Sequence, residues 1–122
     1  MGQSCARVVE YPGLYPTLLD LCGLPRAPWL EGKSLQPLLE NPKAPWNKPA
    51  YTVSVRDWYV GRSVRNERWR YTVWDERRRG AALFDHDHDP NEMPNLLQNP
   101  KHAAVVPELS ALLGNGPVAK RP

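Results

Sequence analysis

Residues 50–84 read AYTVSVRDWYVGRSVRNERWRYTVWDERRRGAALF, and they carry the strongest signal for the fold class. It is rich in Val, Thr, Tyr and Trp, the residue types that favour β-strands. Along 68–75 the apolar Trp69, Tyr71 and Val73 alternate with polar residues, which gives a strand one apolar face. Polar turns separate the apolar runs. We therefore predict a meander of four antiparallel strands, over residues 50–56, 58–65, 68–75 and 81–84.

Downstream of the strands, a second periodicity predicts a helix. Apolar residues recur at helical spacing in Val105, Val106, Leu109, Leu112 and Leu113. This amphipathic pattern can cover one face of the sheet. Pro107 has to lie in the first turn, because a proline farther inside a helix costs about 3 kcal/mol. We therefore expect an α+β subdomain over 50–113, followed by a disordered tail over 114–122.

Upstream, residues 1–49 combine short helices with proline-rich loops. Four residues recur at helical spacing, namely Leu14, Leu18, Leu21 and Cys22. With Gly23 as a C-terminal cap, they predict a short helix over 16–22. Ser34 suits the N-cap of a further helical turn over 34–39. The three prolines of the following segment predict an exposed connector over 41–49.

The composition sets further bounds. No window approaches the roughly 18 apolar residues that span a bilayer, and the first ten residues lack the apolar run of a secretory signal. We therefore expect no contact with a membrane. The two cysteines, Cys5 and Cys22, are too few for a disulfide framework, although a single bridge is an open alternative.

Three groups of residues, in the same order and spacing, resemble a known family. LYPTLLDLCGLP (14–25), with EGKSL (31–35) and PLL (37–39), resembles the segment that follows the catalytic half of sulfatases. GRSVRNERWRYTVW (61–74) resembles the C-terminal sheet of iduronate-2-sulfatase and its bacterial relatives. ALFD (82–85), DPNE (89–92) and NL (95–96) resemble the turn that follows. The chain thus resembles the C-terminal segment of a sulfatase of the iduronate-2-sulfatase and arylsulfatase family, within the alkaline-phosphatase-like superfamily.

The resemblance implies an organisation in two parts. In that family a large α/β domain carries the chemistry, and a smaller C-terminal subdomain with a four-stranded antiparallel sheet and a helix helps to shape the substrate cleft. It assigns 1–49 to the edge of that α/β domain, which is missing here, and 50–113 to the C-terminal subdomain. The expected partners are the N-terminal catalytic domain and a sulfated glycan. Family members are typically periplasmic, extracellular or lysosomal.

The resemblance also implies the cofactors of the parent enzyme. Sulfatases use a formylglycine made from a C-x-[PA]-x-R motif, together with a calcium ion that neutralises the sulfate oxygens. In Cys22-Gly23-Leu24-Pro25-Arg26 the proline stands one position late, and Cys5-Ala6-Arg7 fits no better. We therefore expect Cys22 to be a buried structural thiol. This chain is expected to hold no catalytic residue and no cofactor, and to be inactive alone.

The run Asp85-His86-Asp87-His88-Asp89 offers metal-ligand chemistry. However, neighbouring side chains on an extended backbone point to opposite sides, and the resemblance assigns this run to a structural turn. We expect no metal site. A small metal-binding protein built around His86 and His88 is the alternative, and stoichiometric metal binding would reveal it.

Eight of the eleven arginines fall between Arg56 and Arg79. Five of them interleave with tryptophans, in the set Arg56, Arg62, Arg65, Arg68, Arg70, Trp58, Trp69 and Trp74. Guanidinium groups match sulfate, carboxylate or phosphate, and indoles stack on sugar rings. The alternative is a solvated sheet face whose arginine stems lie over the tryptophans, balanced by Glu67, Asp75 and Glu76.

Three residues of this cluster are our candidates for substrate contacts: Arg56, Trp58 and Arg62. They border the irregular connection between the first two strands, whereas Arg77 to Arg79 are expected to decorate a hairpin tip. The sulfatase resemblance favours an anionic glycan over nucleic acid as the ligand.

Two hypotheses about function follow. The first is a C-terminal segment of a sulfuric ester hydrolase that contributes to the substrate cleft and to stability. The second is a stand-alone basic binding module for sulfated glycans or other polyanions. Under the first, an isolated segment would expose apolar residues that normally face the large domain, which predicts poor solubility or association. These residues are Leu14, Leu18, Leu21, Leu35, Leu38 and Leu39.

Overall fold

The computed structural model describes residues 2–56 and 58–118. The chain divides into two compact units, Met1–Lys48 and Pro49–Pro122. Within the described ranges, no helix is both long and apolar enough to cross a membrane. Of the expected tail over 114–122, Gly114 closes the last helix, and residues 119–122 lie outside the described residues.

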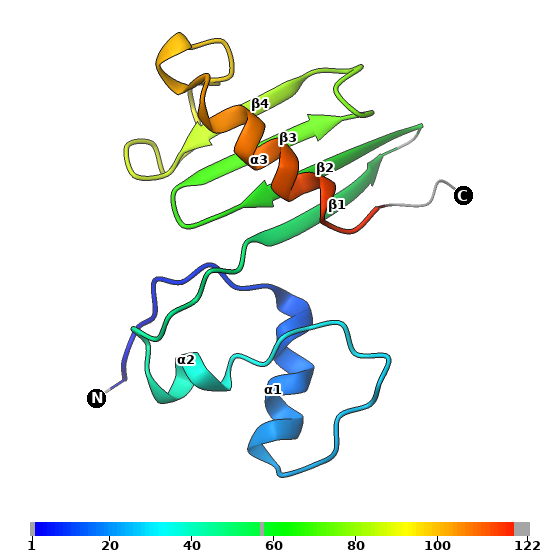
Figure 1. Cartoon of the computed structure of the whole chain (residues 1–122), viewed down its shortest axis with the longest axis vertical. Helices are drawn as coiled ribbons and strands as arrows, with labels where there is room; N and C mark the ends of the chain where they lie inside the picture. Colours follow the sequence, from blue (N-terminus) through cyan, green and yellow to red (C-terminus); the bar gives the residue numbers. More distant parts are fainter. Residues whose placement is uncertain (1, 57, 119–122) are drawn as a thin grey trace. The chain divides into compact units, whose positions relative to one another are not determined.

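The second unit is built on a four-stranded antiparallel sheet (Figure 1). Its strands are β1 (Ala50–Arg56), β2 (Tyr59–Arg65), β3 (Trp69–Trp74) and β4 (Ala81–Asp85). They lie in the order β1-β2-β3-β4, so each strand pairs with its neighbour in sequence. The predicted meander and the α+β class are confirmed, with bounds that differ from the expected ones by at most one residue.

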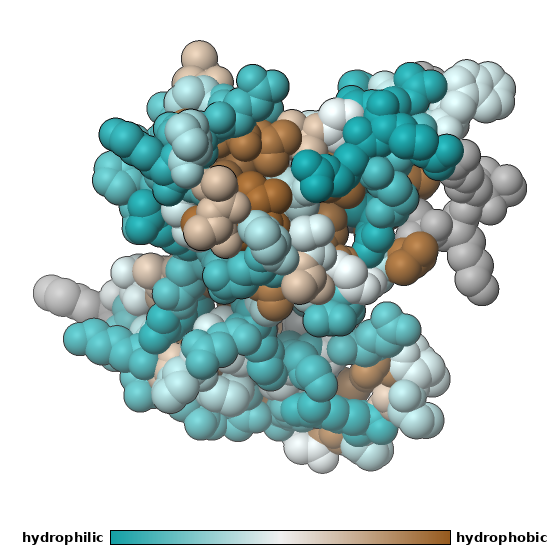
Figure 2. Space-filling model, turned by 45° about the horizontal axis from the view of Figure 1, so that its top comes forward, coloured by the Kyte–Doolittle hydropathy of each residue, from teal (hydrophilic) through white to brown (hydrophobic). Residues whose placement is uncertain are grey.

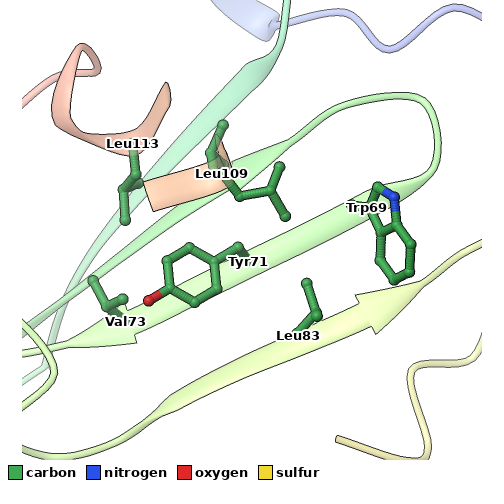
Figure 3. Packing of buried hydrophobic residues seen from close by; sticks show 7 residues of the cluster. Trp69, Tyr71, Val73, Leu83, Leu109 and Leu113 are labelled. Carbon is green, nitrogen blue, oxygen red and sulfur yellow. The ribbon is translucent and has the colours of Figure 1, made fainter. Parts of the chain in front are cut away.

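Helix α3 (Val105–Gly114) lies across one face of this sheet (Figure 1). The alternation along β3 places Trp69, Tyr71 and Val73 in the core, as predicted. Figure 3 shows Leu109 and Leu113 of the helix above these strand residues. Pro107 lies in the first helical turn, where its missing N–H removes no helical hydrogen bond. The packed helix therefore follows directly from the apolar period of its sequence.

Two turns fix the register of the sheet. In the β2–β3 turn, Asn66 Oδ1 accepts hydrogen bonds from the amides of Arg68 and Trp69, at 3.0 and 2.6 Å. In the β3–β4 turn, Asp75 Oδ1 accepts a bond from the Val60 amide at 3.2 Å. Side-chain oxygens of Asn and Asp commonly replace backbone acceptors in this way. The resulting register places Gly61 of β2 opposite Trp74 of β3.

The first unit contains a 3-10 turn, η1 (Tyr11–Gly13), and two helices, α1 (Leu14–Leu21) and α2 (Gln36–Glu40). Thr17 joins them, because its hydroxyl donates to the Gly13 carbonyl at 2.6 Å and accepts from the Leu35 amide at 2.8 Å. The first helix starts two residues before the predicted one. Ser34 Oγ accepts from the Gln36 amide at 3.3 Å, although Leu35 is the N-cap residue of α2.

The expectation that Cys22 is buried is wrong, since the structure exposes this thiol. Cys22 is the C-cap of α1, and Gly23 turns the chain away with a φ of +65°. The buried side of α1 consists of Pro16 and Thr17, not of the periodic leucines. A residue that continues the leucine stripe beyond the helix end is therefore exposed as well.

The expected exposed apolar surface is found in part. Leu14, Leu18, Leu21 and Leu39 are between 45% and 61% exposed. Leu35 is half-buried, and Leu38 is buried within the first unit because it faces inward from α2. Figure 2 shows that hydrophobic side chains emerge between hydrophilic ones on the face in view. The four exposed leucines are thus available for a contact outside this unit.

Candidate functional site

Ion pairs engage much of the arginine cluster. Four arginines contact carboxylates within the second unit: Arg62 with Glu76 at 3.1 Å, Arg68 with Asp85 at 2.8 Å, Arg70 with Glu92 at 2.9 Å, and Arg79 with Asp75 at 3.1 Å. The guanidinium of Arg68 also lies 4.6 Å from the centre of the Trp69 ring. Paired arginines and an arginine over a tryptophan are both features of the alternative interpretation, a sheet face whose arginines are balanced by carboxylates.

Arg62 lies beneath the helix and not at the surface. Its side chain is 9% exposed, and its Nη2 donates to the carbonyl of Leu113 at 2.7 Å. Nearby, the Tyr51 hydroxyl donates to the carbonyl of Leu112 at 3.1 Å. A cation at a helix C-terminus is stabilised by the free carbonyls and by the helix dipole. In this structure Arg62 fastens the end of α3 to the sheet.

Arg56 and Trp58 lie at the end of the β1–β2 hairpin. Arg56 is exposed and pairs in register with Tyr59, and Trp58 is 85% exposed in the turn. Strand alternation puts Arg56 and Tyr59 on the sheet face opposite α3, whereas Arg62 lies on the helix face. The structure therefore brings Arg56 and Trp58 near each other in the hairpin and separates Arg62 from them.

A shallow depression lies beside this hairpin, on the face opposite α3. Tyr59, Trp74 and Arg79 line it, and its volume is about 410 Å³. The Arg79 guanidinium lies 4.9 Å from the centre of the Tyr59 ring. The sequence does not predict these three residues as a group, because the position of Arg79 in the charged run Arg77 to Arg79 indicates a hairpin tip. The pairing of Gly61 with Trp74 is the feature that could have indicated this depression, since a glycine opposite an indole leaves room for the ring.

The acidic and histidine-rich run after β4 is held by hydrogen bonds and ion pairs. Asp85 is 3% exposed and receives bonds from Arg68 Nε and Nη2 at 2.9 and 2.8 Å. His88 Nδ1 lies 2.9 Å from the same carboxylate. On the other side of the run, His86 Nε2 lies 2.8 Å from Glu92 Oε1. These contacts account for the run as a structural turn.

The acidic, histidine and cysteine side chains of the described residues do not fit the calcium site of a sulfatase. In the described part of the chain, no group of three or more His, Cys, Asp or Glu side chains is arranged to hold a metal ion. In the segment Cys22-Gly23-Leu24-Pro25-Arg26, the arginine forms an ion pair with α1, because Arg26 Nε donates to Asp20 Oδ1 at 2.7 Å. That guanidinium lowers the pKa of Asp20 to about 2.

The Arg68–Asp85 pair predicts a loss of stability in acid. The hydrogen bonds that Arg68 donates to Asp85 hold the pKa of this carboxyl group well below its ordinary value of 3.8. As the pH falls, Asp85 becomes protonated in the unfolded chain before it does in the folded one. The stability that the ion pair contributes is therefore fully present above about pH 4 and is lost below it. Asp85→Asn should remove this part of the acid loss and destabilise the second unit at pH 7 by about 1 to 2 kcal/mol, since Arg68 is partly solvated.

The measurement is urea unfolding at several pH values between 2 and 7. Asp87→Asn is the matched control, because Asp87 is 59% exposed and lies 3.5 Å from the same guanidinium. We expect it to change the free energy of unfolding by less than about 0.5 kcal/mol. An Asp85→Asn variant with the same acid dependence as the parent chain would refute the role given to this pair.

Comparisons with known proteins agree with the fold. Over 108 residues the chain is 39% identical to a Delta 4,5-hexuronate-2-O-sulfatase of Bacteroides thetaiotaomicron, covering 82% of this chain and 22% of that protein. A solved 2-O GAG sulfatase superposes with a TM-score of 0.73 at 33% identity, covering 84% of this chain and 23% of the other. A further structure contains its substrate D-glucosamine-2-N,6-O-disulfate and superposes with a TM-score of 0.73 at 26% identity, with 84% and 22% coverage.

These similarities show that the chain has the fold of a C-terminal sulfatase segment. The family model described as N-sulphoglucosamine sulphohydrolase, C-terminal, matches residues 2–116, and the chain belongs to this family. The predicted sulfatase resemblance is thereby confirmed. The chain spans about a fifth of the length of the relatives that it matches.

Proposed function

We propose that this chain is the C-terminal subdomain of a sulfatase that acts on sulfated saccharides. It contributes to catalysis by completing the substrate cleft and by stabilising the catalytic domain. The observation that carries the proposal is the 39% identity to a hexuronate-2-O-sulfatase of which the chain spans 22%. The names of the related proteins support a sulfated sugar as the substrate class. A stand-alone binding module receives no support from these relatives.

In this proposal the nucleophile and the metal belong to the catalytic domain. In that domain a formylglycine residue would supply the attacking oxygen, and a bound calcium ion would neutralise the charge of the sulfate. The residues of this chain supply shape and charge at the edge of the cleft. Arg56 and Trp58 are the proposed contacts, because both side chains are exposed at one hairpin end. Arg62 takes a positioning role, since its guanidinium is engaged beneath α3.

The proposed docking side of the first unit is the exposed leucine stripe of α1. Leu14, Leu18 and Leu21 are each about half exposed, whereas the packed side of the helix is formed by Pro16 and Thr17. Burial of a leucine side chain contributes about 1.5–3 kcal/mol. A contact of these three residues with the rest of the α/β domain would therefore attach the first unit to that domain.

A hybrid enzyme tests the proposal. The aligned C-terminal segment of the Bacteroides thetaiotaomicron hexuronate-2-O-sulfatase is replaced by residues 2–118 of this chain. We expect the hybrid to release sulfate, because the segment supplies the sheet, the helix and the leucine stripe. The same enzyme without any C-terminal segment is the control. A hybrid that folds but is no more active than this control would contradict the proposal.

A further inference from the structure

We propose that Tyr59, Trp74 and Arg79 form a binding subsite for an anionic sugar residue, carrying a sulfate or a carboxylate group. The class of ligand rests on the proposed function, and the position of the subsite rests on the geometry of the depression. The three side chains line one open hollow of about 410 Å³ on the sheet face opposite α3. Such a hollow suits part of a saccharide, which presents one apolar ring face and several polar groups.

The indole of Trp74 is fixed in an orientation that leaves it available. It lies over Gly61 of the neighbouring strand, since a Cβ atom at that position would meet Trp74 Cδ1 and Nε1 at 3.3 Å. The glycine thus lets the ring rest on the β2 backbone. Trp74 remains only half-buried in this position. A partly exposed aromatic ring that contacts the sheet backbone is a surface on which the C–H face of a sugar can stack.

Arg79 supplies the charge, and its geometry is set by two contacts. Its Nε donates to Asp75 Oδ2 at 3.1 Å, and its guanidinium lies over the ring of Tyr59. Among the described residues, its Nη groups have no hydrogen-bond partner. The side chain is 56% exposed. A guanidinium fixed through Nε presents its remaining donors as a fork that matches sulfate or carboxylate oxygens.

The conformation of the β3–β4 turn explains why Arg79, and not Arg77 or Arg78, reaches the depression. Asp75, Glu76 and Arg77 have φ values of 48°, 52° and 75°, an uncommon run for residues other than glycine. Hydrogen bonds hold this conformation, because the Arg79 amide donates to the Trp74 carbonyl at 3.1 Å. The turn therefore directs Arg79 back over the sheet. Arg77 does not line the hollow.

The local charge favours an anion over a neutral sugar. Arg56 is exposed on the same face, and Arg77 and Arg78 lie in the adjoining turn. The carboxylate of Glu76 is engaged by Arg62. An exposed cationic surround raises the local concentration of anionic ligands and makes the affinity depend on ionic strength. A neutral saccharide would gain the aromatic contact alone.

The experiment is a titration of the 122-residue chain with a heparin-derived disaccharide at 0.15 M salt, followed by the Trp74 indole N–H resonance in NMR spectra. Trp74→Phe assigns that resonance. Arg79→Ala should weaken binding about tenfold, because a charged two-point contact is lost. Arg77→Ala is the matched control, because it removes the same charge from the same turn outside the hollow, and it should change the affinity less than about twofold.

Several results would overturn the subsite. These are no binding at all, binding that leaves the Trp74 resonance unmoved, or an equal loss in Arg79→Ala and Arg77→Ala. If Arg79→Ala does not fold, Arg79→Lys keeps the charge but removes the planar fork, and it should still weaken binding several-fold. Unsulfated chitobiose should bind at least about tenfold more weakly, because only the aromatic contact remains, and equal affinity for the two disaccharides would overturn the anionic subsite. If the disaccharide does not bind but the hybrid enzyme is active, only this subsite is refuted. If the hybrid enzyme is inactive, the proposed function is refuted.

Discussion

Replacing Leu109 by alanine is expected to destabilise the second unit by about 3 kcal/mol. Leu109 is fully buried between α3 and the sheet, beside Tyr71 and Leu83 (Figure 3). The substitution removes apolar contacts and leaves a cavity, and buried Leu→Ala changes cost about 2–5 kcal/mol. Because Leu109 and Leu113 are the buried residues of α3, the helix should also lose part of its attachment. Domains of this kind are stable by only about 5–15 kcal/mol.

The measurement is urea unfolding followed by far-ultraviolet circular dichroism. Ser110→Ala is the control, since Ser110 is exposed in the same helix and its replacement should stay within about 0.5 kcal/mol of the parent. A Leu109→Ala variant that loses less than about 1 kcal/mol would show that α3 is not packed as described.

Gly32→Ala is expected to be equally severe in the first unit, at about 3 to 4 kcal/mol. A Cβ atom at this position would lie 2.0 Å from the carbonyl oxygen of Pro12 and 2.4 Å from its carbonyl carbon. Backbone atoms cannot move aside as a flexible side chain can. The segments around Pro12 and Gly32 would therefore have to separate, which would also break the bond from the Leu35 amide to Thr17.

Hydrogen exchange of the Leu35 amide reports this local opening. Gly2→Ala is the control, because nothing lies within 4 Å of the added Cβ atom. We expect the Leu35 amide to exchange far faster in Gly32→Ala and at an unchanged rate in Gly2→Ala. Unchanged protection in both variants would mean that these two segments do not approach as closely as the structure shows.

The fold of the second unit could be predicted because local signals agree with one another. The alternation of Trp69, Tyr71 and Val73 sets the buried face of one strand, and Asn66 and Asp75 provide the turn chemistry on either side. With short turns, neighbouring strands have few alternatives to antiparallel pairing. The period of the final helix then leaves one apolar face that fits this sheet.

The candidate site was predictable only in part, because it depends on register and on charge pairing. The sequence places Arg56, Trp58 and Arg62 close together, but strand alternation sends Arg62 to the opposite face from Arg56. The position of Arg79 depends on the run of positive φ values in the β3–β4 turn, and residue types other than glycine give no sign of such a run.

Cys22 illustrates a different limit. Periodicity continued the leucine stripe through it, but the helix ends at Leu21, and the buried side is formed by Pro16 and Thr17. A stripe of leucines usually marks the core. In this unit the stripe marks an exposed surface of the described chain, so a hydrophobic pattern alone could not separate core residues from surface residues.

The rate at which the hybrid enzyme releases sulfate from an unsaturated hexuronate 2-O-sulfate shows whether this chain completes a sulfatase. We expect a rate at least about tenfold above that of the enzyme without a C-terminal segment, which corresponds to about 1.4 kcal/mol of transition-state stabilisation. We also expect no sulfate release by this chain alone. Equal rates for the hybrid and the truncated enzyme, or hydrolysis by the chain alone, would contradict the proposed function.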